Sequence, residues 1–337
     1  MMWQNDFLSL SVPMDMIGRN EEEATMSIKT KIRKIQRFLT DGDYRFLVLA
    51  GRGYLGRMDD VQFLSRMYRI GIGREPDLKN PKSYTEKLQW LKLYDHKPVY
   101  TTMVDKYAVK DYVAQKIGQQ YVIPLLGVWD RVEDIDFDSL PKRFVLKTTH
   151  DSGGIVVCKE KSKLDIPTVR KKLKPFLKRN YYDHNREWPY KNVPHRIIAE
   201  AYMEDSVTAE LRDYKFFTFG GEPKVLYIAQ GRGRGEPTVA DFFDMDFNHL
   251  PFTIDHDMAQ NPPEKPRCFE EMKRLATILS EGTPQLRVDF YEVDGRVYFG
   301  EMTFFHCSGM EAFHPESWDR TFGDWVTLPE PNGEDLP

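Results

Sequence analysis

The sequence predicts an α+β fold in which helices alternate with antiparallel hairpins of short strands. Apolar residues recur at helical spacing from residue 83 to residue 116. Three segments have the pattern of two strands joined by a turn: 144–158, 213–230 and 286–305. Hairpins pair their own strands, so this order favours antiparallel sheets over a doubly wound parallel sheet.

The composition is typical of a globular protein and excludes several classes. The 337 residues are 41% hydrophobic and 30% charged, enough for about two domains. Lys and Arg number 48 against 52 Asp and Glu, and the net charge of −4 argues against a globally basic nucleic-acid binder. The three cysteines form no CxxC pair, so we expect neither a disulfide framework nor a zinc ribbon.

The apolar runs of the sequence bear on its location in the cell. No basic stretch followed by a long apolar run opens the sequence. No apolar run approaches the roughly 20 residues that span a bilayer. We therefore expect a cytoplasmic protein without a membrane span.

Residues 1–40 are predicted to be peripheral, with helical spacing and basic outer positions over 28–39. Residues 51–56 then spell GxGxxG after the apolar run 46–50, as in dinucleotide-binding turns. That fingerprint also requires a second strand and an acidic residue about 20 positions further on. The next segment, 61–70, has a helical pattern and is followed by loop and helix, so we assign no dinucleotide-binding unit here.

The middle of the chain is predicted to contain short strands, at 121–129, 144–147, 155–158 and 196–202. Residues 165–179 have the pattern of one basic amphipathic helix, with Pro167 near its start and Pro175 bending it. A further helix is predicted over 269–279.

The hairpin at 286–305 carries the most informative side chains. Alternate residues of a strand point to one face, so Arg287 lies beside Asp289, and Glu301 beside Thr303. Counting back from the turn places Asp289 and Glu301 side by side across the two strands. Adjacent carboxylates repel unless a cation lies between them, and Mg²⁺ held by carboxylates and substrate phosphates meets that need. The alternative is an ordinary solvated hairpin face.

Lys147 and the turn after it, residues 150–154, form a second candidate site. A lysine that ends a strand, a glycine-rich turn and another strand make a flap whose N–H groups and positive charge suit phosphates. The lysine precedes the glycines, so this is not a Walker A loop. An ordinary hairpin turn explains the same pattern.

Glu200 ends another strand. A glutamate at this position is compatible with a connection that binds adenine, or with a plain strand end.

In this order the segments resemble the ATP-grasp superfamily and its D-alanine–D-alanine ligase-like core. In that superfamily one lysine opens a helix, a second precedes the flap, a hinge segment binds adenine, and Arg-x-Asp and Glu-x-Asn pairs bind metal. The matching residues are Lys106, Lys147, Glu200 with Tyr202 and Met203, Arg287 with Asp289, and Glu301 with Thr303. Thr303 departs from the usual asparagine.

More closely, the chain resembles the TupA-like ATP-grasp family, named for teichuronopeptide biosynthesis. The segments that carry the resemblance include NPKSYTEKLQWLKLYD, VDKYAVKDYV, FDSLPKRFVLKTTHDSGG, YFGEMTFFHCSG and WDRTFGDW. They are spread over residues 60–328. Proteins of this family are often described as polysaccharide biosynthesis proteins and sometimes as glycosyltransferases.

The resemblance implies two lobes that close on ATP. The expected segments are an N-terminal extension (1–59), a helical region leading into the core (60–120), a smaller lobe with the flap (121–205), a larger lobe with the metal hairpin (206–330) and a tail (331–337).

The resemblance also implies a mechanism with ATP and Mg²⁺ as cofactors. A carboxylate attacks the γ-phosphate and becomes an acylphosphate, and an amine then displaces phosphate to form an amide. The residues implied to hold the nucleotide are Lys106, Lys147, His150, Ser152, Gly153, Gly154, Glu200, Tyr202, Met203 and Lys215. Asp289, Glu301 and Thr303 are implied to hold the metal, and Arg287 and Lys147 to act in catalysis.

A few further residues are candidates for substrate contact. Arg232 and Arg234 lie in a glycine-rich cationic loop that suits either an anionic substrate or solvent. His306 and Ser308 follow the metal-binding strand and could face the acceptor substrate. The aromatic residues within 181–190 suit either sugar stacking or packing of their own loop.

We therefore expect a ligase that attaches an amino acid to a uronic acid of a cell-surface polysaccharide. The alternatives are a glycosyltransferase of polysaccharide biosynthesis and an amide ligase for a peptide or natural product. The expected partners are a small carboxylate, such as a uronic acid or sugar nucleotide, and an amine. We expect no nucleic-acid partner and no membrane span. Both expectations are compatible with a protein that binds at the periphery of a polysaccharide assembly system.

Overall fold

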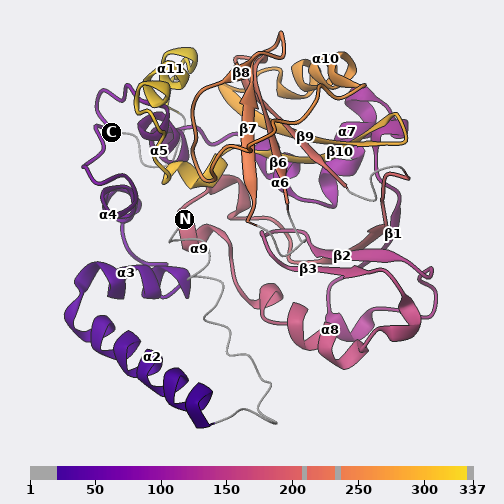
Figure 1. The fold of residues 1–337 in the computed structure, drawn as a ribbon, viewed down its shortest axis with the longest axis horizontal. Helices are drawn as coiled ribbons and strands as arrows, with labels where there is room; N and C mark the ends of the chain where they lie inside the picture. The colour runs from indigo at the N-terminus through magenta and orange to yellow at the C-terminus, as the bar shows by residue number, and fades with distance from the viewer. Residues whose placement is uncertain (1–20, 207–210, 232–236, 332–337) are drawn as a thin grey trace.

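The computed structural model describes residues 21–206, 211–231 and 237–331 (Figure 1). Its centre is two antiparallel sheets with helices packed around them, which confirms the predicted α+β class. The smaller sheet has the strand order β1-β4-β2-β3, and the larger has the order β10-β9-β5-β6-β7-β8. None of the helices in the described ranges is long and apolar enough to cross a membrane.

The smaller sheet supplies the flap. It contains β1 (Leu125–Trp129), β2 (Phe144–Thr148), β3 (Ile155–Cys158) and β4 (Ile197–Ala201). Antiparallel β2 and β3 form the predicted hairpin, and β2 also pairs with β4, so that Lys147 lies opposite Ile198. Phe144 and Leu146 alternate with partly buried positions of β2 and enter one core with Val169 of helix α8.

Helix α8 (Ile166–Leu173) is shorter than the helix predicted over 165–179. It ends before Pro175, and a separate 3₁₀ turn, Phe176–Lys178, follows. Proline has no N–H to donate to the preceding turn and its ring collides with that turn's carbonyl, so the helix stops instead of bending.

The larger sheet contains β5 (Asp213–Phe219), β6 (Glu222–Gln230), β7 (Val239–Phe243), β8 (His249–Leu250), β9 (Gln285–Val293) and β10 (Arg296–Thr303). Helix α10 (Phe269–Ser280) packs against β5, β6 and β9. The turns at Gly220-Gly221 and Asp294-Gly295 are as predicted, and all four residues have positive φ. The pattern did not predict β7 or β8, because both are too short to show alternation clearly.

Residues 21–117 are helical, with α2 (Glu21–Thr40), α3 (Gly42–Gly51), α4 (Asp60–Ile72), α5 (Tyr84–Tyr94), α6 (Pro98–Val104) and α7 (Ala108–Ile117). The apolar run 46–50 lies inside α3 and is not a strand, so residues 51–56 do not form a dinucleotide-binding turn. Buried Arg186 follows the short helix α9 (Tyr182–Asn185) and joins it to α4 through an ion pair with Asp60 at 2.7 Å.

Helix α5 connects the N-terminal helices to the end of the larger sheet. A capping box of Ser83 and Glu86 begins the helix. Thr85, the second residue of the helix, binds the buried carboxylate of Asp319 on α11 (Ser317–Trp325) through its N–H at 2.8 Å and its hydroxyl at 2.7 Å. The remaining short elements are 3₁₀ turns: Gln119–Tyr121, Val132–Asp134, Lys161–Lys163, Trp188–Tyr190 and His306–Gly309.

Candidate active site

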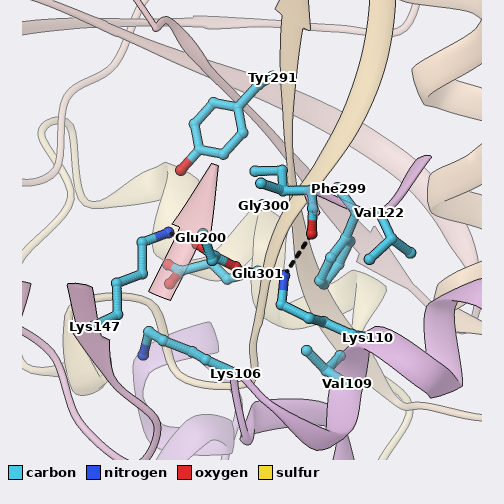
Figure 2. A pocket seen from close by; sticks show the side chains of 11 residues that line it. Lys106, Val109, Lys110, Val122, Lys147, Glu200, Tyr291, Phe299, Gly300 and Glu301 are labelled. Carbon is cyan, nitrogen blue, oxygen red and sulfur yellow. Dashed lines mark hydrogen bonds and ion pairs between the residues drawn. The ribbon is translucent and has the colours of Figure 1, made fainter. Parts of the chain in front are cut away.

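One charged cavity is lined by residues of both sheets and of helix α7 (Figure 2). Its polar lining consists of Lys106, Lys110, Lys147, Glu200, Tyr291 and Glu301. The predicted lysines and the predicted metal-binding strand, far apart in sequence, therefore meet at one place. Val109, Val122 and Phe299 add apolar walls, which suits a ligand with both a flat ring and a charged end.

Buried Glu200 lies between two lysines. Its carboxylate is 2.5 Å from Nζ of Lys110 and 2.7 Å from Nζ of Lys147. Burial raises the pKa of Glu200, but the two neighbouring ammonium groups outweigh burial, and the pKa ends below its ordinary value. A carboxylate between two cations is stable here, and its removal would leave two positive charges facing each other.

The flap is held close to this cavity by Lys106, which lies between α6 and α7. Nζ of Lys106 donates to the carbonyl of Asp151 at 2.7 Å, and its backbone N–H donates to the carbonyl of Thr149 at 3.1 Å. Gly154 closes the flap, where a Cβ atom would lie 1.8 Å from Oγ1 of Thr148, so only glycine fits. Gly153 has a φ of +106°, a conformation that also favours glycine.

Arg287 is the centre of a buried network on the β9–β10 hairpin. Its Nε and Nη2 atoms donate to the two oxygens of Asp289 at 2.7 and 2.8 Å. Nη2 also lies 2.9 Å from Oε1 of Glu301 and 2.9 Å from Oγ1 of Thr303. The register agrees with the prediction, since Glu301 pairs with Asp289 and Thr303 with Arg287, with a bulge at Gly300.

The carboxylates of this hairpin differ in how well they could receive a metal ion. Glu301 lines the cavity, and its side chain is 42% exposed. Asp289 is 1% exposed, and besides Arg287 it binds Nζ of Lys215 at 2.5 Å. The donor types fit Mg²⁺, with Glu301 directly accessible and Asp289 available once Lys215 releases it. The Thr303 hydroxyl is bound to Arg287 and lies 3.4 Å from Glu301.

His306 holds the remaining nitrogen of Arg287. Nη1 lies 2.8 Å from Nδ1 of His306, and because a guanidinium only donates, Nδ1 accepts and Nε2 carries the hydrogen. Ligand atoms of His306, Cys307 and Asp255 lie within 4.8 Å of one another. An imidazole with its hydrogen on Nε2 cannot bind a metal through that atom, so these residues form a hydrogen-bonding group and not a metal centre.

The turn after His306 has a strained backbone. Cys307 and Ser308 have φ values of 47° and 56°, and Gly309 follows with 63°. Side chains are rarely found in this left-handed region, which costs about 1–2 kcal/mol per residue. Burial raises the pKa of Cys307 well above its ordinary value, so its thiol stays protonated and does not serve as a nucleophile.

Helix α5 stabilises this turn with two buried side chains. Nζ of Lys92 donates to the carbonyl and the hydroxyl of Ser308 at 2.8 and 2.7 Å. The Gln89 amide donates to the carbonyls of Ser308 and Gly309 at 3.2 and 3.0 Å. Burial lowers the pKa of Lys92 to about 7, and burial raises that of Glu187, whose charge acts on Lys92, to about 7. Ser308 is thus tied to the protein interior.

Several predicted residues do not line the cavity. His150 is buried and stacks on His195, with ring centroids 3.8 Å apart, and its Nε2 atom binds the carbonyl of Phe176. The hydroxyl of Tyr202 donates to Glu204 at 3.0 Å, and Met203 is half-buried beside it. Ser152 is exposed at the tip of the flap. Arg232 and Arg234 lie outside the described residues.

The aromatic segment 181–190 forms packing contacts of its own. Tyr181 packs edge-on against Tyr190 with centroids 4.8 Å apart, and Trp188 stacks on His96 at 4.5 Å. Tyr182 binds Asp60 through its hydroxyl. Each of these rings thus has a packing partner, as the loop-packing alternative expects.

Residues 244–246 have the spacing Asp-x-Asp. Asp244 has a structural role, because it accepts from the N–H groups of two later residues in its turn.

The prediction missed three residues at the site. Lys110 follows Lys106 by one helical turn in the segment VDKYAVKDYV, and that spacing was the available signal. Tyr291 lies two residues after Asp289 on β9, which places both on one face. The charge of Asp213 and burial raise the pKa of Tyr291 well above its ordinary value, so its hydroxyl remains a donor. Lys92 gave no signal, because the sequence does not show that this lysine of α5 is buried.

Comparison with known proteins supplies independent evidence. The model of a family described as TupA-like ATPgrasp matches residues 86–327, which is most of the chain. No curated protein matches the sequence.

Solved structures of related architecture include three ligases and synthases. D-alanine–D-alanine ligase from Bacillus anthracis is 13% identical, with 85% of this chain and 93% of that chain covered and a TM-score of 0.39. The Helicobacter pylori enzyme is 11% identical, with coverages of 74% and 68% and a TM-score of 0.38. N5-carboxyaminoimidazole synthase from Aspergillus clavatus is 11% identical, with coverages of 68% and 52% and a TM-score of 0.37. These scores are too low to carry an argument, so the assignment rests on the family match.

Proposed function

Because the chain belongs to the TupA-like ATP-grasp family and is an ATP-grasp ligase, we propose that it joins a carboxylate to an amine using ATP and Mg²⁺. The observation that carries the proposal is the charged cavity, where Lys110 and Lys147 are held on Glu200 next to Glu301. Each ammonium group has three donors, so both lysines can bind phosphate oxygens while they stay on Glu200, and no buried charge is left unpaired. The remaining lone pairs of Glu200 can accept from hydroxyl or amino donors of the nucleoside.

The flap covers the phosphates in this proposal. Lys106 holds the carbonyl of Asp151, so its ammonium group lies between the flap and the cavity. Backbone N–H groups of Ser152, Gly153 and Gly154 supply donors that need no side chain. A closed flap keeps water away from the acylphosphate, which would otherwise be hydrolysed.

Arg287 stabilises the charge that develops during both steps. The carboxylate oxygen attacks the γ-phosphorus and ADP leaves. The amine then attacks the acyl carbon, loses a proton, and phosphate leaves with the former carboxylate oxygen. Asp289, Glu301 and His306 hold the guanidinium before the substrate arrives, so no reorganisation is needed at the moment of reaction.

Glu301 and Asp289 are the proposed holders of Mg²⁺, with Thr303 beside them. When bound, the ion would supply positive charge against the phosphates of ATP. Lys215 now compensates the charge of Asp289, and its release would open that carboxylate. Asp289 would then have Mg²⁺ beside it in place of Lys215, so this carboxylate would have a cation next to it both before and after the metal binds.

We further propose a uronic acid as the carboxylate, an amino acid as the amine, a cell-surface polysaccharide as the setting and the cytoplasm as the location. The support for this substrate class is the resemblance to the TupA-like family, which is named for teichuronopeptide biosynthesis. The two sheets would form the cores of the two lobes, 121–205 and 206–330.

The test is a ligation assay with ATP, Mg²⁺, mixed uronic acids and mixed amino acids. ADP release that requires both a carboxylate and an amine is the expected result. The Lys147→Met variant should lose about 100-fold in kcat/KM for ATP, whereas Lys163→Met, at an exposed lysine of the same lobe, should match the wild type. Release of UDP from a UDP-sugar without use of ATP would identify a glycosyltransferase and overturn the proposal.

A further inference from the structure

Helix α2 exposes a row of apolar side chains. Ile32, Ile35 and Leu39 are 58%, 62% and 69% exposed. Their spacing of three and four residues places them within about 60° of one another around the helix. A surface helix of a globular protein normally turns such a row toward the core. The row on α2 instead points to solvent.

The C-terminal part of α2 contacts α3 through the Arg37 side chain and through backbone carbonyls. Nε of Arg37 lies 3.2 Å from the Asp41 carboxylate, and its guanidinium stacks on the Tyr44 ring of α3 at 4.4 Å. Arg45 of α3 donates to the carbonyls of Phe38 and Leu39, each at 3.2 Å. Figure 1 shows α2 at the edge of the molecule, reached through α3 and remote from both sheets. The helix is attached with its apolar row outward.

Three glutamates begin the same helix, but its later part is strongly basic. Residues 29–37 contain five lysines and arginines and no acidic residue, in a chain whose net charge is −4. Arg33 and Lys34 lie on the two sides of the helix away from the row, by the same helical geometry. Long basic side chains reach around a helix to place their charges at a polar boundary while the apolar side is buried.

We propose that α2 docks on the surface of an anionic lipid bilayer. Ile32, Ile35 and Leu39 enter the boundary between headgroups and acyl chains, and Arg33 and Lys34 bind lipid phosphates. The helix lies in the plane of the surface and does not span it. This docking is independent of the ligase proposal, because none of these residues belongs to the cavity.

Charge favours lipid over a second copy of the chain as the occupant of the row. A second copy packed through the same row would offer only apolar side chains and no anionic group to Arg33 and Lys34, which lie on the sides of the helix away from the row. The row also spans only about two turns, whereas a stable coiled coil needs three to four heptads. An anionic bilayer offers acyl chains to the apolar row and lipid phosphates to the cationic side chains.

The test is co-sedimentation of the full chain with vesicles. Binding is expected to phosphatidylcholine–phosphatidylglycerol vesicles and not to phosphatidylcholine alone, and it should weaken as salt increases. The triple variant Ile32→Ser, Ile35→Ser, Leu39→Ser should lose about tenfold or more in partitioning. The double variant Arg33→Gln, Lys34→Gln should lose about tenfold and show a shallower salt dependence.

A matched control removes exposed apolar side chains elsewhere. Val99→Ser with Met258→Ser should bind vesicles as the wild type does, since both residues lie outside α2. Circular dichroism confirms that each variant is folded. Equal binding by the wild type and the serine variant, or no binding by the wild type, overturns the proposal. A dimer that the serine variant loses, without any lipid binding, would assign the row to a second copy instead.

Discussion

Nη1 of Arg287 donates to Nδ1 of His306 at 2.8 Å, so the position of the guanidinium that we propose to be catalytic depends on a neutral histidine. The other two donor nitrogens of Arg287 bind Asp289, Glu301 and Thr303. The ring of His306 packs edge-on against Phe217 with centroids 5.1 Å apart, which fixes its orientation. Rigid support of this kind is what electrostatic stabilisation of a transition state requires.

Loss of His306 is therefore expected to affect turnover more than nucleotide binding. His306→Ala should lower kcat by about 10- to 100-fold with little change in KM for ATP, because Lys110 and Lys147 remain in place. His306→Asn keeps an acceptor near the position of Nδ1 and should restore most of the rate. Steady-state kinetics of the two variants tests this, and an asparagine variant as slow as the alanine variant would contradict it.

Glu200 is expected to stabilise the fold at neutral pH. Its pKa in the folded protein is lowered, so its contribution is complete above the ordinary pKa of 4.5 and is lost as the pH falls through the lower folded value. Glu200→Gln leaves Lys110 and Lys147 uncompensated and should cost about 3 kcal/mol of unfolding free energy at pH 7. Urea unfolding of both proteins from pH 7 to pH 3 measures this, and the difference should shrink toward acid pH.

Asp289 and Glu301, the two carboxylates proposed to hold Mg²⁺, should differ in their effect on stability. Glu301→Gln, at an accessible site, should lower activity by about two orders of magnitude or more while leaving the melting temperature nearly unchanged. Asp289→Asn should lower activity as far and also destabilise the protein, because Arg287 and Lys215 lose a buried partner. Thermal unfolding beside the ligation assay distinguishes the two. Near-normal rates in both variants would remove the metal assignment.

Gly154 should not tolerate any side chain. A Cβ atom would overlap Oγ1 of Thr148, so Gly154→Ala should displace the flap and lower kcat/KM for ATP by about tenfold or more. Gly42→Ala is the matched control, since its Cβ would approach nothing nearer than 3.7 Å. Equal kinetics of the two alanine variants would show that the flap geometry does not matter.

Lys92 and Glu187 should behave as an energetically coupled pair. Their pKa values are shifted to about 7 from opposite directions, mainly by burial, so each charge is tolerated because of the other. Lys92→Met and Glu187→Gln should each destabilise the fold by about 3 kcal/mol, and the double variant by less than their sum. A double-mutant cycle measured by urea unfolding gives the coupling. Strict additivity would mean that the two charges do not interact.

Local pattern was sufficient to predict most of the fold. The turns at Gly220-Gly221 and Asp294-Gly295 have the residues that positive φ demands, and the register of the last hairpin follows from counting back from its turn. The prediction was wrong for 165–179, where helical spacing continued through a proline that ends the helix. The prediction also omitted β7, a five-residue segment that forms a strand through its pairing with β6.

The candidate site was predictable where the chemistry lies in short motifs. Arg287, Asp289 and Glu301 have motif spacing, and Lys147 stands at a strand end before glycines. His150 was misplaced because sequence cannot show that it stacks on His195 away from the cavity. Lys92 could not be found at all, because its role depends on Ser308, 216 residues away in the chain. Contacts of that range exist only once the fold is formed.

The most direct test of the account follows an oxygen atom. The full chain is incubated with ATP, Mg²⁺ and uronic acids labelled with ¹⁸O in the carboxylate, together with mixed amino acids, and the released phosphate is analysed by mass spectrometry. An acylphosphate route transfers one labelled oxygen from the carboxylate to each phosphate released with the amide. Amide formation with unlabelled phosphate, or turnover that releases UDP from a UDP-sugar and leaves ATP intact, would contradict the account.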